Sequence, residues 1–259
     1  QGLVAILAAV VIAFVARSVV IHVYNYCEQG LFVDTASGKA MSFANVLYVA
    51  DREDGAAIAD DGMRTLFYEI YDRADADQMN YKYAPSGILA RAAHHEACHD
   101  ELNFTYFSDA AREYVGERQG IYADTYQELM IALDEVAAAL SAELMPEVLG
   151  RYVLNYINVI ALGFVRTVAY ENTVLAWYAV CIYIAAVALT VVLWRRNPES
   201  MAASFMAVVL LTIVGNVCAT ALMIQCISRY MIYNLPLFYM AGLLELRELR
   251  ERHGGQDGI

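Results

Sequence analysis

One segment of the chain places two histidines four residues apart, with a glutamate directly after the first. It reads His95-Glu96-Ala97-Cys98-His99 and matches the HExxH pattern of zinc peptidases. Residues four apart share one face of a helix, so the two imidazoles could hold a zinc ion while Glu96 polarises its water. The alternative is structural, with His95 and His99 on the inner face of an amphipathic helix and their ring nitrogens bonded to neighbouring carboxylates. A membrane-anchored metallopeptidase is therefore one hypothesis for the function.

A second pattern, Arg229-Tyr230, directly follows a long apolar run and stands beside Asn234 and Pro236. A guanidinium group stays protonated, and its planar fork matches two oxygens of a phosphate. An arginine and a tyrosine at this place can equally be plain interfacial anchors, because both side chains are stable at the headgroup level.

A third signal is Arg17, an ionisable residue about two thirds of the way along the first apolar segment. Such a residue is a functional hypothesis by default, with a carboxylate or a lipid phosphate as its partner. The alternative is that its long side chain snorkels to the nearby headgroups.

The elements that must position these residues are membrane helices. Hydrophobic residues make up 59% of the chain, charged residues only 18%, and the mean hydropathy is +0.42. No charged residue occurs from Ser200 to Ser228, which exceeds the roughly 20 residues that a helix needs to cross a bilayer. Four apolar segments predict four spans, and they are Leu3–Tyr24, Thr173–Leu193, Ala202–Ile224 and Met231–Leu246.

Charge predicts the orientation of these spans. The Arg195-Arg196 pair and the arginine-bearing tail after residue 246 are expected in the cytoplasm, which requires two crossings between them. The first span, 1–25, is then followed by an extracytoplasmic domain, 26–171, and the remainder, 172–259, holds three spans and a cytoplasmic tail. Residues 25–171 carry 24 of the 29 acidic residues and 10 of the 17 basic ones, which argues against nucleic acid as a partner.

The outward domain is predicted to be mostly helical. Helices are expected over Ser86–Leu102 and Ser108–Val115, the latter stopping near Gly116 or Gly120, and an apolar stripe from Leu129 to Leu144 predicts a helix that Pro146 interrupts. Residues 148–166 are expected to lie along the outer membrane surface, and a fifth span is the alternative. A disulfide between Cys27 and Cys98 is possible in an extracytoplasmic domain.

The segments Gly215-Asn216-Val217-Cys218-Ala219 and Ser228-Arg229-Tyr230-Met231-Ile232-Tyr233-Asn234-Leu235-Pro236 resemble the last two membrane helices of polytopic bacterial glycosyltransferases of the C-fold type. These enzymes use polyprenyl-phosphate-linked sugars, and the resemblance covers about residues 140–250. It implies a protein of the bacterial plasma membrane that transfers a sugar to an envelope acceptor, with Arg229 and Tyr230 at the carrier phosphate and Arg17 assisting.

The resemblance implies a catalytic carboxylate in the first outward loop. Asp34, Asp51, Glu53 and Asp54 are the candidates for a general base in this chain. The chain begins without methionine, so we expect a carboxyl-terminal fragment whose catalytic carboxylate lies upstream. No cofactor is evident, and a divalent metal is possible in that superfamily. The remaining hypothesis is a non-enzymatic envelope assembly protein, in which the helices anchor the outward domain.

Overall fold

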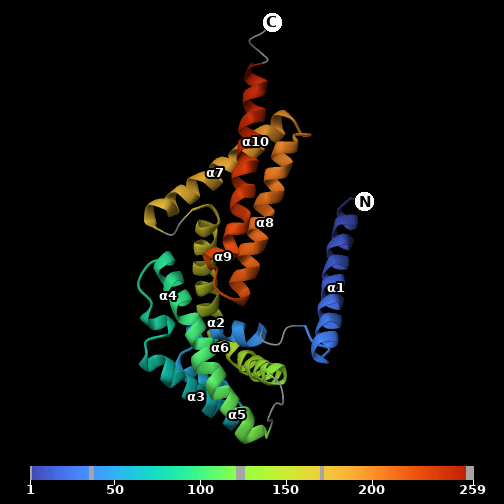
Figure 1. Ribbon diagram of the computed structural model, residues 1–259. Helices are drawn as coiled ribbons and strands as arrows, with labels where there is room; N and C mark the ends of the chain where they lie inside the picture. Colours follow the sequence, from blue (N-terminus) through green and yellow to red (C-terminus); the bar gives the residue numbers. More distant parts are fainter. Residues whose placement is uncertain (1, 35–37, 121–125, 170–171, 255–259) are drawn as a thin grey trace.

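A computed structural model describes residues 2–34, 38–120, 126–169 and 172–254, and every regular element in these ranges is a helix. The prediction of an all-α protein is confirmed. Figure 1 shows the arrangement. The elements are α1 Gly2–Gln29, α2 Gly38–Val49, η1 Arg52–Ala57, α3 Asp61–Ala76, η2 Tyr81–Tyr83, α4 Ile88–Asp100, η3 Glu101–Phe107, α5 Ser108–Gln119, α6 Tyr126–Val168, α7 Thr173–Arg196, α8 Met201–Met223, α9 Ser228–Met231, η4 Ile232–Asn234 and α10 Leu235–Gly254.

The described part of the chain has two hydrophobic cores that share one helix. The first core extends from Ala40 to Val148 and joins α2 to α5 with the first part of α6; we call this unit the helical domain. The second extends from Val159 to Ala241 and joins the end of α6 with α7, α8 and α10; we call this unit the bundle. The first half of α6 packs in one core and its last turns pack in the other, so α6 carries the connection between them (Figure 1). In the same view α1 stands apart from both units.

Helix α6 does not end at its proline. The sequence predicts an interruption at Pro146, and this prediction is wrong, because the helix continues through Pro146 to Val168 over 43 residues. A proline inside a helix removes one backbone hydrogen bond and crowds the preceding turn. Leu144 and Val148, one on each side of it, are fully buried in the helical domain. Their packing outweighs the local penalty.

The other predicted boundaries of the helical domain are close to the observed ones. The helix expected over Ser86–Leu102 is α4, and its chain continues as the π-helical segment η3. Helix α5 ends at Gln119 and is capped by Gly120, whose φ of +63° lies in the left-handed region that a glycine adopts without steric cost.

Three helices are long and apolar enough to cross a membrane, judged over the described residues by length and composition. They are Tyr126–Val168, Val174–Arg196 and Met201–Met223. The last two coincide with the predicted second and third spans. The first contains the segment 148–166, which the sequence predicts to be either a helix on the membrane surface or a further span. Helices α1 and α10 form where the first and fourth spans are predicted, and four spans remain a prediction.

Side-chain caps fix the starts of the two apolar helices α7 and α8. Asn172 Oδ1 accepts a hydrogen bond from the Leu175 amide at 2.8 Å, and Ser200 Oγ accepts one from the Ala203 amide at 3.2 Å. These bonds satisfy amide groups that have no partner inside the helix.

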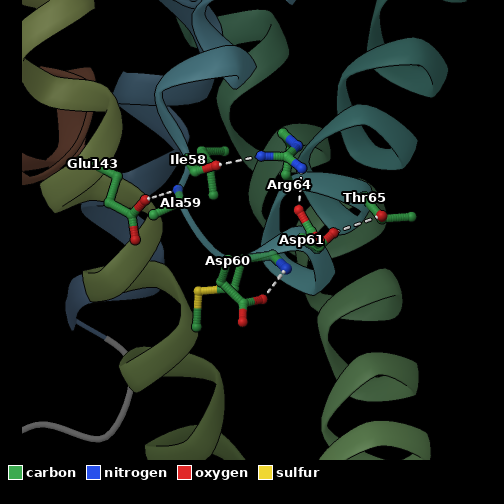
Figure 2. A network of polar contacts seen from close by, with 8 residues as sticks. Ile58, Ala59, Asp60, Asp61, Arg64, Thr65 and Glu143 are labelled. Carbon is green, nitrogen blue, oxygen red and sulfur yellow. Dashed lines mark hydrogen bonds and ion pairs between the residues drawn. The ribbon is translucent and has the colours of Figure 1, made fainter.

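A polar network joins the start of α3 to α6 (Figure 2). Asp60 Oδ1 accepts a hydrogen bond from the Met63 amide at 2.7 Å and so caps α3, and Arg64 pairs with Asp61 and donates to the Ile58 carbonyl at 3.0 Å. The carboxylate of Glu143, in α6, accepts from the Ala59 amide at 2.5 Å. Several carboxylates of this acidic domain therefore act in capping and pairing.

Gly163 brings α6 into close contact with α8 and with the turn that follows it. A Cβ atom built on Gly163 would lie 2.8 Å from Val217 Cγ1 and 2.9 Å from Cys226 Sγ, whereas a Cβ on Gly150, in the same helix, meets nothing within 4 Å. The backbone of α6 at Gly163 therefore touches the side chains of Val217 and Cys226 directly. Any side chain at position 163 would force these two neighbours to move.

We expect Gly163→Ala to destabilise the protein by about 1–3 kcal/mol, because the added methyl group overpacks the contact with Val217 and Cys226. The matched control is Gly150→Ala, which we expect to be neutral or stabilising by up to about 1 kcal/mol through helix propensity. Thermal unfolding in detergent measures both. Equal effects of the two substitutions would contradict a tight contact at Gly163.

Candidate functional site

The connection between α8 and α10 presents the Arg229-Tyr230 pair. Arg229 is exposed, its Nη2 donates to the Tyr230 hydroxyl at 3.1 Å, and its Cζ lies 5.0 Å from the centre of the Tyr230 ring. The Tyr230 carbonyl accepts a hydrogen bond from Asn216 Nδ2 at 3.1 Å. Asn216, in α8, thereby holds the backbone of the pair in one position.

The charge of Arg229 is not neutralised by a carboxylate in the described part of the chain. The neighbouring apolar side chains of Ile232 and Tyr233 are 53% and 73% exposed. A cation that stands beside exposed aromatic and aliphatic side chains at the end of an apolar helix is typical of the interface between membrane and water. Such a guanidinium can bind an anionic headgroup.

The other predicted members of a phosphate site do not join this turn. Arg17 is exposed on α1, which lies apart from α8 and α10 in Figure 1. Asp34 follows the same helix, where its backbone carbonyl accepts a hydrogen bond from Asn25 Nδ2 at 2.6 Å.

The predicted carboxylates of η1 have structural partners. Arg151, in α6, pairs with Asp51 at 3.0 Å, also pairs with Asp54, and donates to the Val49 carbonyl at 2.8 Å. The Asp54 carboxylate in addition accepts from the Asp51 amide at 2.6 Å. Glu53 lies exposed on the same short helix. Asp51 and Asp54 therefore neutralise Arg151 and fix the start of η1.

The predicted histidines lie on α4 and face the core. His95 is buried, its ring centre lies 4.6 Å from that of Tyr48, and neither ring nitrogen has a hydrogen-bond partner among the residues that the structure describes. His99 is also buried, with Nε2 at 3.2 Å from the Met41 carbonyl and Nδ1 at 3.2 Å from the Asp100 carboxylate. Because a carbonyl only accepts, His99 Nε2 carries a hydrogen and donates to Met41.

Burial governs the protonation of these side chains. It lowers the pKa of His95 to about 3, with the neighbouring His99 and His94 adding in the same direction. Burial also lowers the pKa of His94 and of His99, although the Asp100 carboxylate opposes the change at His99. The thiol of Cys98 has its pKa raised to about 11 for the same reason.

Glu96, the glutamate of the His95-Glu96-x-x-His99 motif, forms an ion pair with an arginine of α6. Glu96 Oε2 lies 2.6 Å from Nη2 of Arg166, at the end of α6, and Nη1 of the same guanidinium donates to the Cys226 carbonyl at 2.9 Å. Within the described ranges no three or more His, Cys, Asp or Glu side chains gather closely enough to hold a metal ion. Cys27 is exposed and Cys98 is buried, and both are free thiols.

Sequence reasoning missed the buried polar residues that join the two units. Arg166 is one, and its signal was an ionisable residue inside the apolar stretch 159–168. Gln225 is another, since its Nε2 donates to Asp100 Oδ1 at 3.1 Å. Asn45 in α2 donates to the Leu222 carbonyl of α8 at 3.4 Å. No sequence pattern marks these last two residues.

Comparison of the chain with protein-family models, with curated proteins and with solved structures gives no match.

The pKa of His95 predicts a loss of stability in acid. An unfolded histidine titrates near 6.5 and folded His95 near 3, so between these values the unfolded chain binds more protons and stability falls as the pH falls. We expect His95 to remove about 3 kcal/mol between pH 6.5 and pH 4.

Unfolding of the wild type and of His95→Leu as a function of pH tests this. The substitution removes two unpartnered nitrogens, so we expect the variant to be at least as stable at pH 7 and to lose less stability in acid. Parallel pH profiles of the two proteins would contradict a neutral buried imidazole.

Proposed function

We propose that this protein binds the phosphate of a membrane lipid at Arg229, and that the lipid is the polyprenyl-phosphate-linked sugar donor of a glycosyl transfer to an envelope acceptor. The observation that carries the proposal is the exposed, un-neutralised guanidinium at the end of α8, held by Tyr230 and indirectly by Asn216. The choice of lipid rests on the resemblance of residues 215–236 to C-fold glycosyltransferases.

The proposal includes four spans, with residues 26–171 outside and the carboxyl-terminal tail in the cytoplasm. Gln225 contacts Asp100, and Asn45 contacts Leu222, so the helical domain and the Arg229 turn lie on the same end of the bundle. This supports a common side for both. The pairing of Arg166 with Glu96 keeps the end of α6 beside the helical domain. This favours a segment 148–166 that lies at the outer end of the bundle, and it disfavours a further span.

The proposal assigns no described carboxylate as the catalytic base. Asp51 and Asp54 neutralise Arg151, and Glu96 neutralises Arg166. The same observation favours a second candidate function, a non-enzymatic assembly protein whose helical domain binds an envelope partner while the bundle holds it at the membrane. Binding of the phosphate lipid without transfer of its sugar would favour this second function.

Binding of a polyprenyl phosphate to the purified protein tests the proposal. We expect Arg229→Ala to weaken binding about tenfold or more, because a charge-assisted hydrogen bond contributes roughly 1.5–3 kcal/mol and 1.4 kcal/mol is a factor of ten. Arg229→Lys should be intermediate, since an ammonium group lacks the planar fork. Native mass spectrometry of the detergent-solubilised protein measures the bound fraction.

The matched control is Arg247→Ala, because Arg247 is exposed at the other end of α10 and pairs with Glu251 at 2.7 Å. This variant should bind like the wild type. A neutral polyprenol that binds as well as the phosphate, or an Arg229→Ala variant with unchanged affinity, would refute the phosphate site.

A further inference from the structure

A buried carboxyl group lies inside the bundle, on α10. It is not part of the proposed phosphate site at Arg229. Glu245, in α10, has no exposed surface. Its Oε1 lies 2.7 Å from Thr190 Oγ1 of α7, and the same hydroxyl oxygen lies 2.9 Å from the Ala186 carbonyl. The second carboxyl oxygen, Oε2, has no hydrogen-bond partner within the described ranges.

The hydrogen count around Thr190 indicates a neutral carboxylic acid. A threonine hydroxyl has one hydrogen, and the Ala186 carbonyl can only accept. With an ionised Glu245, two acceptors would compete for that one hydrogen. With a protonated Glu245, the acid donates to Thr190 Oγ1 and the hydroxyl donates to Ala186, so both contacts are hydrogen bonds. The neutral form also avoids the desolvation penalty of a buried unpaired charge.

A cavity of about 190 Å³ has Glu245 among its lining residues. Its walls come from α7, α8 and α10 and are apolar except at Glu245 and Tyr239, and the hydroxyl of Tyr239 is already engaged with the Val168 carbonyl at 2.7 Å and the Tyr178 hydroxyl at 2.9 Å. Leu243 and Leu246, at the wall, are 67% and 56% exposed, so the cavity opens sideways from the bundle.

We infer that this cavity binds the hydroxyl-bearing end of an apolar, membrane-soluble alcohol, with Glu245 as the hydrogen-bond partner of the hydroxyl. The apolar walls match a hydrocarbon chain, and the volume exceeds the roughly 150 Å³ of an engineered cavity that binds benzene. The hydrogen of the neutral acid is donated to Thr190, and Oε2 remains as an acceptor for the hydrogen of a ligand hydroxyl. A cationic ligand instead needs the ionised carboxylate that the Thr190 contacts disfavour. Because the carboxyl is fully covered, the ligand displaces a neighbouring side chain as it enters.

This site is independent of the Arg229 turn. Glu245 belongs to the later turns of α10, whereas Arg229 precedes that helix, and the two sites differ in charge and in ligand. Substitutions at one site should leave binding at the other unchanged.

Photocrosslinking tests the inference on the full chain in lipid nanodiscs. The probe is a dodecanol analogue with a diazirine on its chain, and crosslinked peptides are mapped by mass spectrometry. We expect crosslinks in α7 and α10 around residues 182–189 and 238–246, reduced at least fivefold by excess dodecanol and much less by dodecane. Dicyclohexylcarbodiimide, which modifies protonated carboxyl groups in apolar surroundings, should label Glu245, and dodecanol should slow that labelling.

Two substitutions separate the hydroxyl contact from the apolar space. Glu245→Leu should reduce specific crosslinking at least fivefold, while Glu245→Gln, which keeps a donor and an acceptor, should retain most of it. Gly242→Leu should abolish crosslinking by filling the cavity, and its fold should be retained because a Cβ on Gly242 would meet only Met206 Cε, at 3.7 Å.

Arg229→Ala is the control that must leave crosslinking unchanged. Equal competition by dodecane and dodecanol, or full crosslinking of Glu245→Leu, would overturn the inference in favour of a merely apolar space. Stronger competition by dodecylamine than by dodecanol would overturn it in favour of an ionised, cation-binding carboxylate.

Discussion

The pairing of Arg166 with Glu96 is the interaction on which the relation between the two units depends. Arg166 is 7% exposed, and its guanidinium joins three separate parts of the chain: α6 itself, the carboxylate of α4 and the Cys226 carbonyl after α8. Removing one member of a buried pair leaves an uncompensated charge and typically costs about 3–5 kcal/mol. One turn earlier, Gly163 brings the same helix against Val217 and Cys226. An ion pair and a tight packing contact thus both fix the end of α6 against the turn that follows α8.

The contacts of Arg166 and Gly163 with Cys226 also determine the position of the Arg229 turn. The carbonyl of Cys226 accepts a hydrogen bond from Arg166, and the Cys226 side chain packs against Gly163. The preceding residue, Gln225, donates to Asp100. Arg229 follows within a few residues, so the helical domain, rather than α8 alone, fixes the position of the exposed guanidinium. A ligand bound at Arg229 would therefore lie close to the helical domain, which is where an acceptor or a protein partner could reach it.

The sequence predicted the elements whose signal is continuous and local. The uncharged run over α8 and the apolar run over α7 were sufficient, because length and hydropathy alone define such helices. Pro146 misled the prediction, because the packing of Leu144 and Val148 is a tertiary effect that the local penalty does not contain. The motif His95-Glu96-x-x-His99 predicted a helix correctly but not its partners. Arg166 lies 70 residues from Glu96, and no local pattern links the two.

Two ionisable residues of the bundle illustrate how the surroundings decide the chemistry of a site. Arg229 lies at the edge, where water solvates its charge and an anion can approach, so its useful property is a permanent positive charge. Glu245 is enclosed by apolar side chains and by a hydroxyl whose single hydrogen is needed elsewhere, so its useful property is the ability to donate and accept without charge. A lipid with a phosphate and a lipid with a free hydroxyl would thus be recognised at different places on the bundle, because water solvates a charge at the exposed Arg229 turn and cannot reach the buried carboxyl group of Glu245.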